Sequence, residues 1–126
     1  KLNMSTQSNL KLVELVAASR KSASATGSDV DLKGYINPGG RQMKAFLSVT
    51  GVSGTSPTLD VKIQEADATS SYTDISGATF TQATTTTSEE IHFRTNKRYV
   101  RAIATLAGTS PVFDVATLLL VEKRTT

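Results

Sequence analysis

The sequence contains no cysteine and no tryptophan, and it has a single histidine, His92, among 126 residues. Without cysteine the chain can form neither a disulfide scaffold nor a thiolate metal site, and it has no cysteine nucleophile. One histidine leaves no second imidazole for a His-rich metal site or a proton relay. We therefore expect no catalytic residues, no bound metal and no cofactor.

Long apolar runs are absent as well. The longest candidate, Leu118-Leu119-Leu120-Val121, is only as long as part of a strand, whereas a membrane-spanning helix needs about 20 apolar residues. Residues 10–18 are interrupted by Lys11 and Glu14, which is not the pattern of a signal peptide. The length suits one compact domain. We expect that domain to span residues 10–126, with no membrane partner.

Charge of either sign is low and dispersed. The formal net charge is +3, from 14 Lys and Arg against 11 Asp and Glu, and aromatic residues make up 6% of the chain. A nucleic-acid binder usually gathers its positive charge on one face beside aromatic platforms. Here the basic residues occur in ones and twos, so we expect no nucleic-acid partner. The two basic pairs, Arg20 with Lys21 and Lys97 with Arg98, are candidate contacts for an acidic protein partner.

Short alternating apolar runs dominate what is present. Thr and Ser together make up about a quarter of the chain, and Gly, Ser, Asn and Pro separate the runs. In residues 58–65, Leu59, Val61 and Ile63 alternate with polar residues, which predicts a strand with one buried face. The pattern as a whole predicts an all-β protein, an antiparallel β-sandwich of which a jelly roll is one form.

Further strands are predicted along the chain. The candidate ranges are 45–52, 72–75, 79–82, 90–94, 98–106 and 112–122, with a Ser76-Gly77 turn between the second and third of these runs. The range 112–122 becomes apolar on both faces towards its end, which predicts a strand that is central in its sheet or covered on both sides. Core positions are predicted at Leu59, Val61, Ile63, Val100, Ala102, Phe113 and Val115.

The N-terminal part of the chain allows two interpretations. Residues 10–18 fit a helical spacing through Leu12, Leu15 and Val16, and they also alternate as a strand would. The all-β pattern beside them favours the strand. Residues 1–9 lack apolar periodicity and are expected to form an extended arm. Residues 22–29 and 84–88 are polar and low in complexity, and they are expected to be loops.

An eight-residue motif occurs twice. Gly54-Thr55-Ser56-Pro57-Thr58-Leu59-Asp60-Val61 recurs as Gly108-Thr109-Ser110-Pro111-Val112-Phe113-Asp114-Val115. Each copy lies between two apolar runs, so each predicts a β-hairpin in which Gly supplies an unusual φ and Pro begins the outgoing strand. We expect the two hairpins to occupy equivalent places in the sandwich.

The repeat also places one aspartate, Asp60 or Asp114, in each copy. A carboxylate dyad or a shared cation site would be the functional interpretation. A single active site does not need two copies of its motif, whereas a structural repeat does. We therefore expect each aspartate to accept hydrogen bonds from the Thr and Ser of its own hairpin.

Other chemistry-bearing residues read as structural. The segment from Asp67 to Asp74 lacks the spacing of a calcium loop and is expected to be a turn between strands. His92 is expected at the surface or facing a cross-strand partner. Asn37-Pro38-Gly39-Gly40 is a turn signal without the features of a phosphate loop. Glu89-Glu90 is expected to form weak surface pairs with Arg94.

Several segments together resemble a family of small tailed-phage virion proteins that accompany the major capsid protein. The segments that carry the resemblance are 12–15, 30–35, 54–65, 72–80 and 97–101, and the likeness extends over most of the chain from Leu10 onwards. The shared residues are mostly strand and turn framework, and none is catalytic. No capsid-contact residue carries over by position.

This resemblance implies a decoration, or cement, protein on the exterior of a phage capsid. Its implied partners are the major capsid protein and further copies of itself, as a dimer or trimer. The alternative from another class is a carbohydrate-binding or adhesin-like module of a virion fibre or tail. Such a module would expose aromatic rings to sugars, and the chain offers only Tyr35, Tyr72 and Tyr99 besides its phenylalanines.

Overall fold

The computed structural model describes residues 10–35 and 42–122 of the chain. Within them, all regular structure is strand apart from one 3₁₀ turn, and no helix is long and apolar enough to cross a membrane. The elements, in chain order, are β1 (Leu10–Lys21), β2 (Ala25–Thr26), β3 (Val30–Asp31), the 3₁₀ turn (Leu32–Gly34), β4 (Gln42–Ala66), β5 (Thr73–Thr79), β6 (Thr87–Arg94) and β7 (Tyr99–Glu122).

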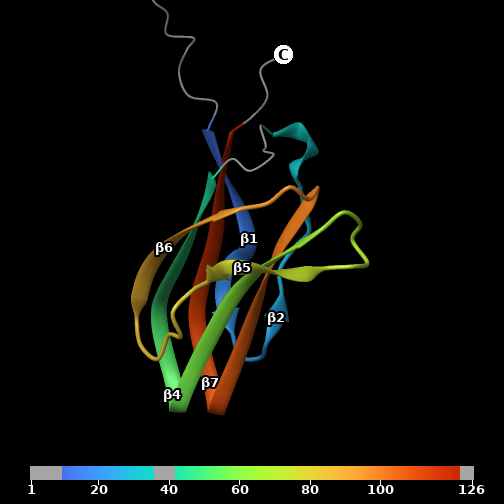
Figure 1. Cartoon of the computed structure of the whole chain (residues 1–126). Helices are drawn as coiled ribbons and strands as arrows, with labels where there is room; N and C mark the ends of the chain where they lie inside the picture. The colour runs from blue at the N-terminus through green and yellow to red at the C-terminus, as the bar shows by residue number, and fades with distance from the viewer. Residues whose placement is uncertain (1–9, 36–41, 123–126) are drawn as a thin grey trace, which may run out of the picture.

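Two very long antiparallel strands, β4 and β7, form the centre of the fold. They pair along almost their whole length, from Lys44 opposite Leu120 to Ala66 opposite Tyr99. Midway, both strands turn sharply, and the ribbon folds back on itself into two arms (Figure 1). The turn falls on the repeated Gly-Thr-Ser-Pro segments, where Thr55 pairs with Thr109 between register shifts.

The geometry of the two turns is nearly identical. Gly54 and Gly108 have φ values of 115° and 113°, and Ser56 and Ser110 have 48° and 49°. A Cβ on Gly54 would lie 2.6 Å from the carbonyl oxygen of Ser110, and one on Gly108 would lie 2.6 Å from that of Ser56. The two copies of the repeat therefore cross each other about an approximate two-fold axis, and glycine lets their backbones approach.

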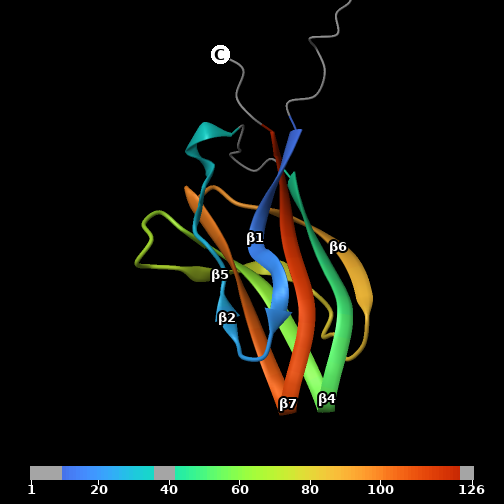
Figure 2. The same cartoon turned by 180° about the vertical axis from the view of Figure 1, so that it is seen from behind.

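The arms form two layers around a shared core. The first layer contains residues 42–53 of β4 and 112–122 of β7, with β1 beside β7 and β6 beside β4. The second contains residues 58–66 of β4 and 99–107 of β7, with β2 and β3 beside β7 and β5 beside β4. The reverse view shows β1 along the red arm of β7 and β2 along the orange arm (Figure 2).

The all-β, sandwich-like fold class is confirmed. All seven predicted core residues are buried, at 0–3% exposure, and side chains from both layers belong to one core cluster. Residues 10–18 form part of β1, as the strand interpretation predicted. The described strands follow this folded-ribbon topology, with seven strands in one sheet, and not the two Greek keys of a jelly roll.

The prediction of two β-hairpins is wrong, although the equivalence of the repeats and the role of glycine are confirmed. The runs on either side of each Gly-Thr-Ser-Pro segment do not pair with each other. Val52 instead pairs with Phe113 and Leu59 with Leu106, so each run pairs with the other copy. A repeat motif defines where the chain bends, but it carries no information on which strand lies beside it.

Three smaller predictions also change. Ser76-Gly77 does not separate two strands, because β5 runs through it with a register shift and a φ of 82° at Gly77. The expected loop at residues 84–88 overlaps the start of β6 at Thr87, and the one at 22–29 contains β2. The predicted arm at residues 1–9 and the Asn37-Pro38-Gly39-Gly40 turn lie outside the described residues.

Candidate functional site

The outer surface of the first layer carries a cluster of apolar side chains. Leu10 and Leu12 on β1 are 55% and 53% exposed, and they are the exposed large hydrophobic residues of the described chain. Register places Leu12 beside Leu120, and Leu118 beside Phe46, on this same surface. We call this set, Leu10, Leu12, Phe46, Leu118 and Leu120, the apolar face.

The prediction that residues 112–122 are central or covered on both sides is confirmed in its first form, because β7 lies between β1 and β4. Leu119 and Val121 point inward and are buried at 0% and 4% exposure. Leu118 and Leu120 point outward and are only partly buried. Among the described residues, no further layer covers this outer surface of β7.

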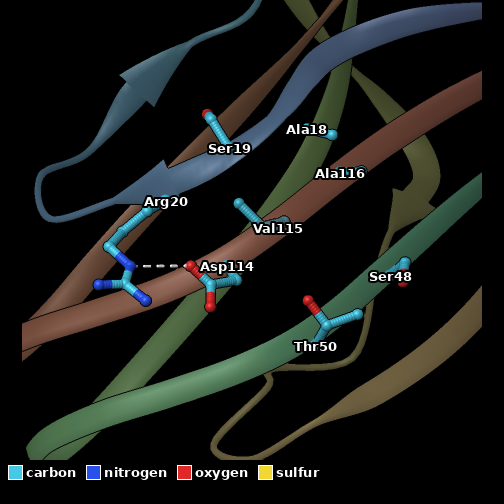
Figure 3. A pocket seen from close by; sticks show the side chains of 8 residues that line it. All are labelled: Ala18, Ser19, Arg20, Ser48, Thr50, Asp114, Val115 and Ala116. Carbon is cyan, nitrogen blue, oxygen red and sulfur yellow. Dashed lines mark hydrogen bonds and ion pairs between the residues drawn. The ribbon is translucent and has the colours of Figure 1, made fainter.

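Towards the fold of the ribbon, the same surface continues as a shallow trough (Figure 3). Its volume is about 430 Å³, and small side chains line it, among them Ala18, Ser48 and Ala116. Arg20 and Asp114 close one end, with 3.1 Å between the arginine Nε and the aspartate Oδ1. This bond raises the pKa of the Arg20 guanidinium, which therefore remains charged. The trough is thus a mainly apolar surface depression with the Arg20–Asp114 ion pair at one end.

The outer surface of the second layer is different in character, because its polar groups bind one another. The Tyr72 hydroxyl donates to Asp29 at 2.7 Å, and the Arg101 guanidinium lies 4.0 Å from the centre of the Tyr72 ring. Arg101 also donates to Gln64, and Gln64 donates to Asp74. Burial, together with the bond to Asp29, raises the pKa of the Tyr72 hydroxyl, which keeps it a neutral donor.

Cations complete this second surface. Lys62 pairs with Asp74 at 3.1 Å, and hydrogen bonds from Gln64 and Lys62 lower the pKa of that carboxyl. Arg98 donates to both oxygens of Asp31, at 3.0 and 2.8 Å, and also lies 5.0 Å from the Tyr99 ring centre. The structure therefore brings Arg101 onto Tyr72, which lies far from it in the sequence, whereas Arg98 and Tyr99 are neighbours in the sequence. Asp31 balances the charge of Arg98.

The four basic residues proposed from sequence do not form one patch. Arg20 and Lys21 end β1, opposite Asp114 and Phe113 and close to the fold of the ribbon. Lys97 and Arg98 precede β7, at the far end of the other arm. Arg20, Lys97 and Arg98 each pair with an aspartate, namely Asp114, Asp67 and Asp31. They remain partner-contact candidates, now as separate points.

Asp60 and Asp114 lie on different layers and do not form a dyad. Asp60 pairs in register with Thr105 in the second layer, and Asp114 with Gly51 in the first. The expectation that each bonds to its own Thr and Ser is wrong. Asp60 accepts from the Gln82 side chain at 3.1 and 3.3 Å, whereas Asp114 accepts from Arg20.

The remaining acidic residues are engaged in structural pairs. Glu90 lies 2.6 Å from His92 and 3.7 Å from Lys44, and the bond to His92 is the largest cause of its lowered pKa. Glu89 instead accepts from the backbone and hydroxyl of Thr81. Neither pairs with Arg94 as expected. His92 lies at the surface opposite Lys44, in keeping with its prediction.

No cluster for metal chemistry emerges from the part of the chain that the structure describes. Within residues 10–35 and 42–122, no three His, Cys, Asp or Glu side chains gather in a way that could hold an ion. The segment between Asp67 and Asp74 is a turn between β4 and β5, and its two carboxylates bind Lys97 and Lys62.

Fold and surface together define an all-β folded-ribbon domain with one apolar and one internally paired face. The chain matches no family model, and no curated protein matches its sequence. Among solved structures, it is similar to "SPBc2 prophage-derived protein YomS", with a TM-score of 0.54 and 14% sequence identity. The match covers 91% of this chain and 96% of that one. At this identity the likeness shows a shared fold.

Proposed function

We propose that the protein is a structural component of a phage virion, and specifically a decoration protein that binds the outer surface of the capsid. In this role it stabilises contacts between major capsid subunits and associates with further copies of itself. The observation that carries the proposal is the apolar face on a compact domain. Its support is the fold shared, over nearly the whole of both chains, with a prophage-derived protein.

The physical argument begins from exposed surface. Single exposed leucines are ordinary, but a contiguous group of apolar side chains on one sheet surface marks a contact with another protein. The first layer also ends in two edge strands, β1 and β6, which a partner strand can extend. A small domain that binds through sheet surfaces and edges suits a cement role between capsid subunits.

The basic residues supply the proposed contacts with acidic capsid surface. Arg20 is the most accessible of them, with a side chain 73% exposed despite its pair with Asp114. Exposed ion pairs contribute little to stability, so such a residue can exchange its partner at little cost. Lys97 and Arg98 offer the same exchange at the other end of the molecule.

The carbohydrate-binding alternative gains no support from the tyrosines. Stacking on a sugar needs an open ring face, whereas a guanidinium lies over the ring of Tyr72 and of Tyr99. Both rings are also partly buried. A glycan array gives the direct comparison, and the proposed function predicts that no sugar is retained.

Co-sedimentation with empty capsids tests the decoration role. We expect the intact chain to pellet with capsids and its binding to saturate. Deleting residues 1–8 is expected to weaken capsid binding while leaving the melting temperature nearly unchanged, if the segment acts as a capsid-binding arm. The double variant Arg20→Glu and Arg98→Glu is expected to weaken binding, with Lys33→Glu, on the 3₁₀ turn, as the matched control. Intact protein that stays in the supernatant with capsids would contradict the proposal.

A further inference from the structure

We propose that the apolar face is the surface through which two copies of this chain associate, face to face, about a two-fold axis. The inference rests on the proposed function for its premise that copies associate. The arrangement of the outward side chains in rows indicates which surface the copies share and the symmetry that relates them.

Side chains that share a row lie opposite one another across the four strands. One row contains Leu12, Leu120, Lys44 and His92, because each is paired in register with the next. The neighbouring row contains Glu14, Leu118, Phe46 and Glu90 for the same reason. The first row is therefore apolar with a basic end, and the second is apolar with acidic ends.

This alternation makes the face complementary to itself. In an isologous dimer, a two-fold axis between the two rows places each row against the other row of the partner copy. Leu120 of one copy then packs near Leu118 of the other, at the axis. Lys44 lies beside Phe46 of the other copy and next to its Glu90, so opposite charges meet at the β6 rim, whereas at the β1 rim Glu14 lies opposite Leu12. Such an arrangement has an apolar centre and a charged border, as protein interfaces do.

The outer surface of the second layer lacks such an apolar, self-complementary centre. Its charged groups already bind one another, through Arg98 with Asp31 and Lys62 with Asp74. Its central outward residue on β7 is Ile103, and its neighbours in register are Lys62 and Thr26. Both surfaces carry such pairs, since Glu90 binds Lys44 and His92 on the first layer. They differ at the centre, where the second layer has Arg101 beside Gln64 and the first has Leu118 beside Phe46. Two copies placed on the second layer would therefore bury a guanidinium and an amide, which is costly.

The area of the outer surface of the first layer, which contains the apolar face, sets the expected strength of the dimer. Its four strands, with about four outward side chains along each, span roughly 19 Å by 27 Å, or about 500 Å² on each copy. Two copies would then bury about 1,000 Å² in total, near the lower limit for a specific interface. We therefore expect a reversible dimer with a dissociation constant in the micromolar range or weaker.

Analytical ultracentrifugation of the intact chain over a concentration series tests this inference. We expect wild-type protein to pass from monomer to dimer as concentration rises. Leu12→Lys, at an exposed position outside the core, is expected to raise the dissociation constant at least about tenfold, because it places an unpaired charge in the interface. Thr105→Lys adds the same charge on the outer surface of the second layer and is expected to leave dimerisation unchanged.

A charge reversal tests the proposed symmetry. Lys44→Glu and Glu90→Lys are each expected to weaken the dimer, and an equimolar mixture of the two single variants is expected to restore it as a heterodimer. In that mixture opposite charges meet only across the axis, because the pair that Lys44 and Glu90 make within one copy is lost in both variants. Thermal melts of every variant distinguish loss of the interface from loss of the fold. Wild-type protein that remains monomeric at millimolar concentration would overturn the inference, as would a Leu12→Lys variant that dimerises like wild type.

The capsid assay separates this inference from the proposed function. If wild-type protein is monomeric and Leu12→Lys abolishes capsid binding, the apolar face belongs to the capsid contact. The dimer is then wrong and the decoration role stands. If dimerisation follows the predictions and capsids are ignored, the dimer stands and the decoration role is wrong.

Discussion

Two buried threonines show how one hydroxyl can stabilise a core and another can weaken it. Thr95 donates to Glu65 at 2.5 Å and accepts from the backbone of Lys97 at 3.0 Å. Thr117 is fully buried, and its hydroxyl oxygen has no hydrogen-bond partner. Thr117 faces the core of the first layer. Its equivalent in the other copy of the repeat is Ile63, which faces the core of the second layer. An apolar side chain would suit the position better.

We predict that Thr117→Val raises the free energy of unfolding by about 1–2 kcal/mol, because it removes an unsatisfied buried hydroxyl without changing the shape of the side chain. Thr95→Val is the matched control and is expected to lower it by about 1–3 kcal/mol. Urea denaturation measures both. A destabilised Thr117→Val variant would show that the hydroxyl is satisfied in solution.

A second prediction at this scale concerns pH. The hydrogen bonds from Arg98 and from the backbone of Lys33 lower the pKa of Asp31 from 3.8 to about 2. A lowered pKa in the folded state stabilises the fold above the ordinary value, and this contribution is lost as the pH falls from about 4 to about 2. Asp31→Asn is therefore expected to lower the melting temperature at pH 7 and to match wild type below pH 2.

The exposure of the Asp31 pair gives this pH prediction its control. Salt screens charges at the surface, so the difference between Asp31→Asn and wild type at pH 7 is expected to shrink as ionic strength rises. Melting curves at low and high salt measure it. A difference that persists unchanged at pH 2 would assign the effect to packing.

At the scale of elements, the crossing of β4 and β7 depends on two glycines. Gly54 and Gly108 combine a positive φ with a backbone contact too close for any Cβ. Gly54→Ala and Gly108→Ala are each expected to cost about 2–5 kcal/mol, from left-handed strain together with overpacking. Gly77→Ala has a similar φ but open space around it, and is expected to cost about 1–2 kcal/mol.

Chemical denaturation of the three alanine variants measures this difference. Because the two-fold relation makes Gly54 and Gly108 equivalent, their costs are expected to agree closely. A Gly54→Ala variant no less stable than Gly77→Ala would show that the ribbon can separate at its fold without penalty.

At the scale of the whole molecule, both layers are made from the same two strands. Leu47 in the first layer and Ile63 in the second lie on one continuous β4, and each is buried at 1% or less. One layer therefore cannot unfold while the other keeps its pairing. We expect a single cooperative transition, and Leu47→Ala and Ile63→Ala are each expected to lower its free energy by about 2–5 kcal/mol.

Calorimetry at concentrations where the chain is monomeric checks this cooperativity. The calorimetric and van't Hoff enthalpies are expected to agree for wild type and for both variants. A variant that melts in two steps would mean that the layers are independent units.

Local patterns in the sequence determined much of this protein. Alternation of period two identified the strands and all of the predicted core positions, because a side chain in a strand faces the core or the solvent according to its parity alone. The repeated Gly-Thr-Ser-Pro segments identified where the chain bends, because only certain residues adopt a positive φ. The spacing within residues 10–18 allowed both a helix and a strand, and the all-β pattern of the neighbouring segments favoured the strand that the structure has.

Tertiary structure alone decided which strands are neighbours and which surfaces remain open. A hairpin and a crossed ribbon need the same residues at the bend, and they differ only in contacts between positions about 50 residues apart, which local pattern does not encode. Asp60 therefore accepts a hydrogen bond from Gln82, and Asp114 accepts one from Arg20, instead of from the Thr and Ser hydroxyls of their own repeat copies. The apolar face exists for the same reason, since Leu12, Leu120 and Phe46 come from three strands that meet only when the ribbon folds.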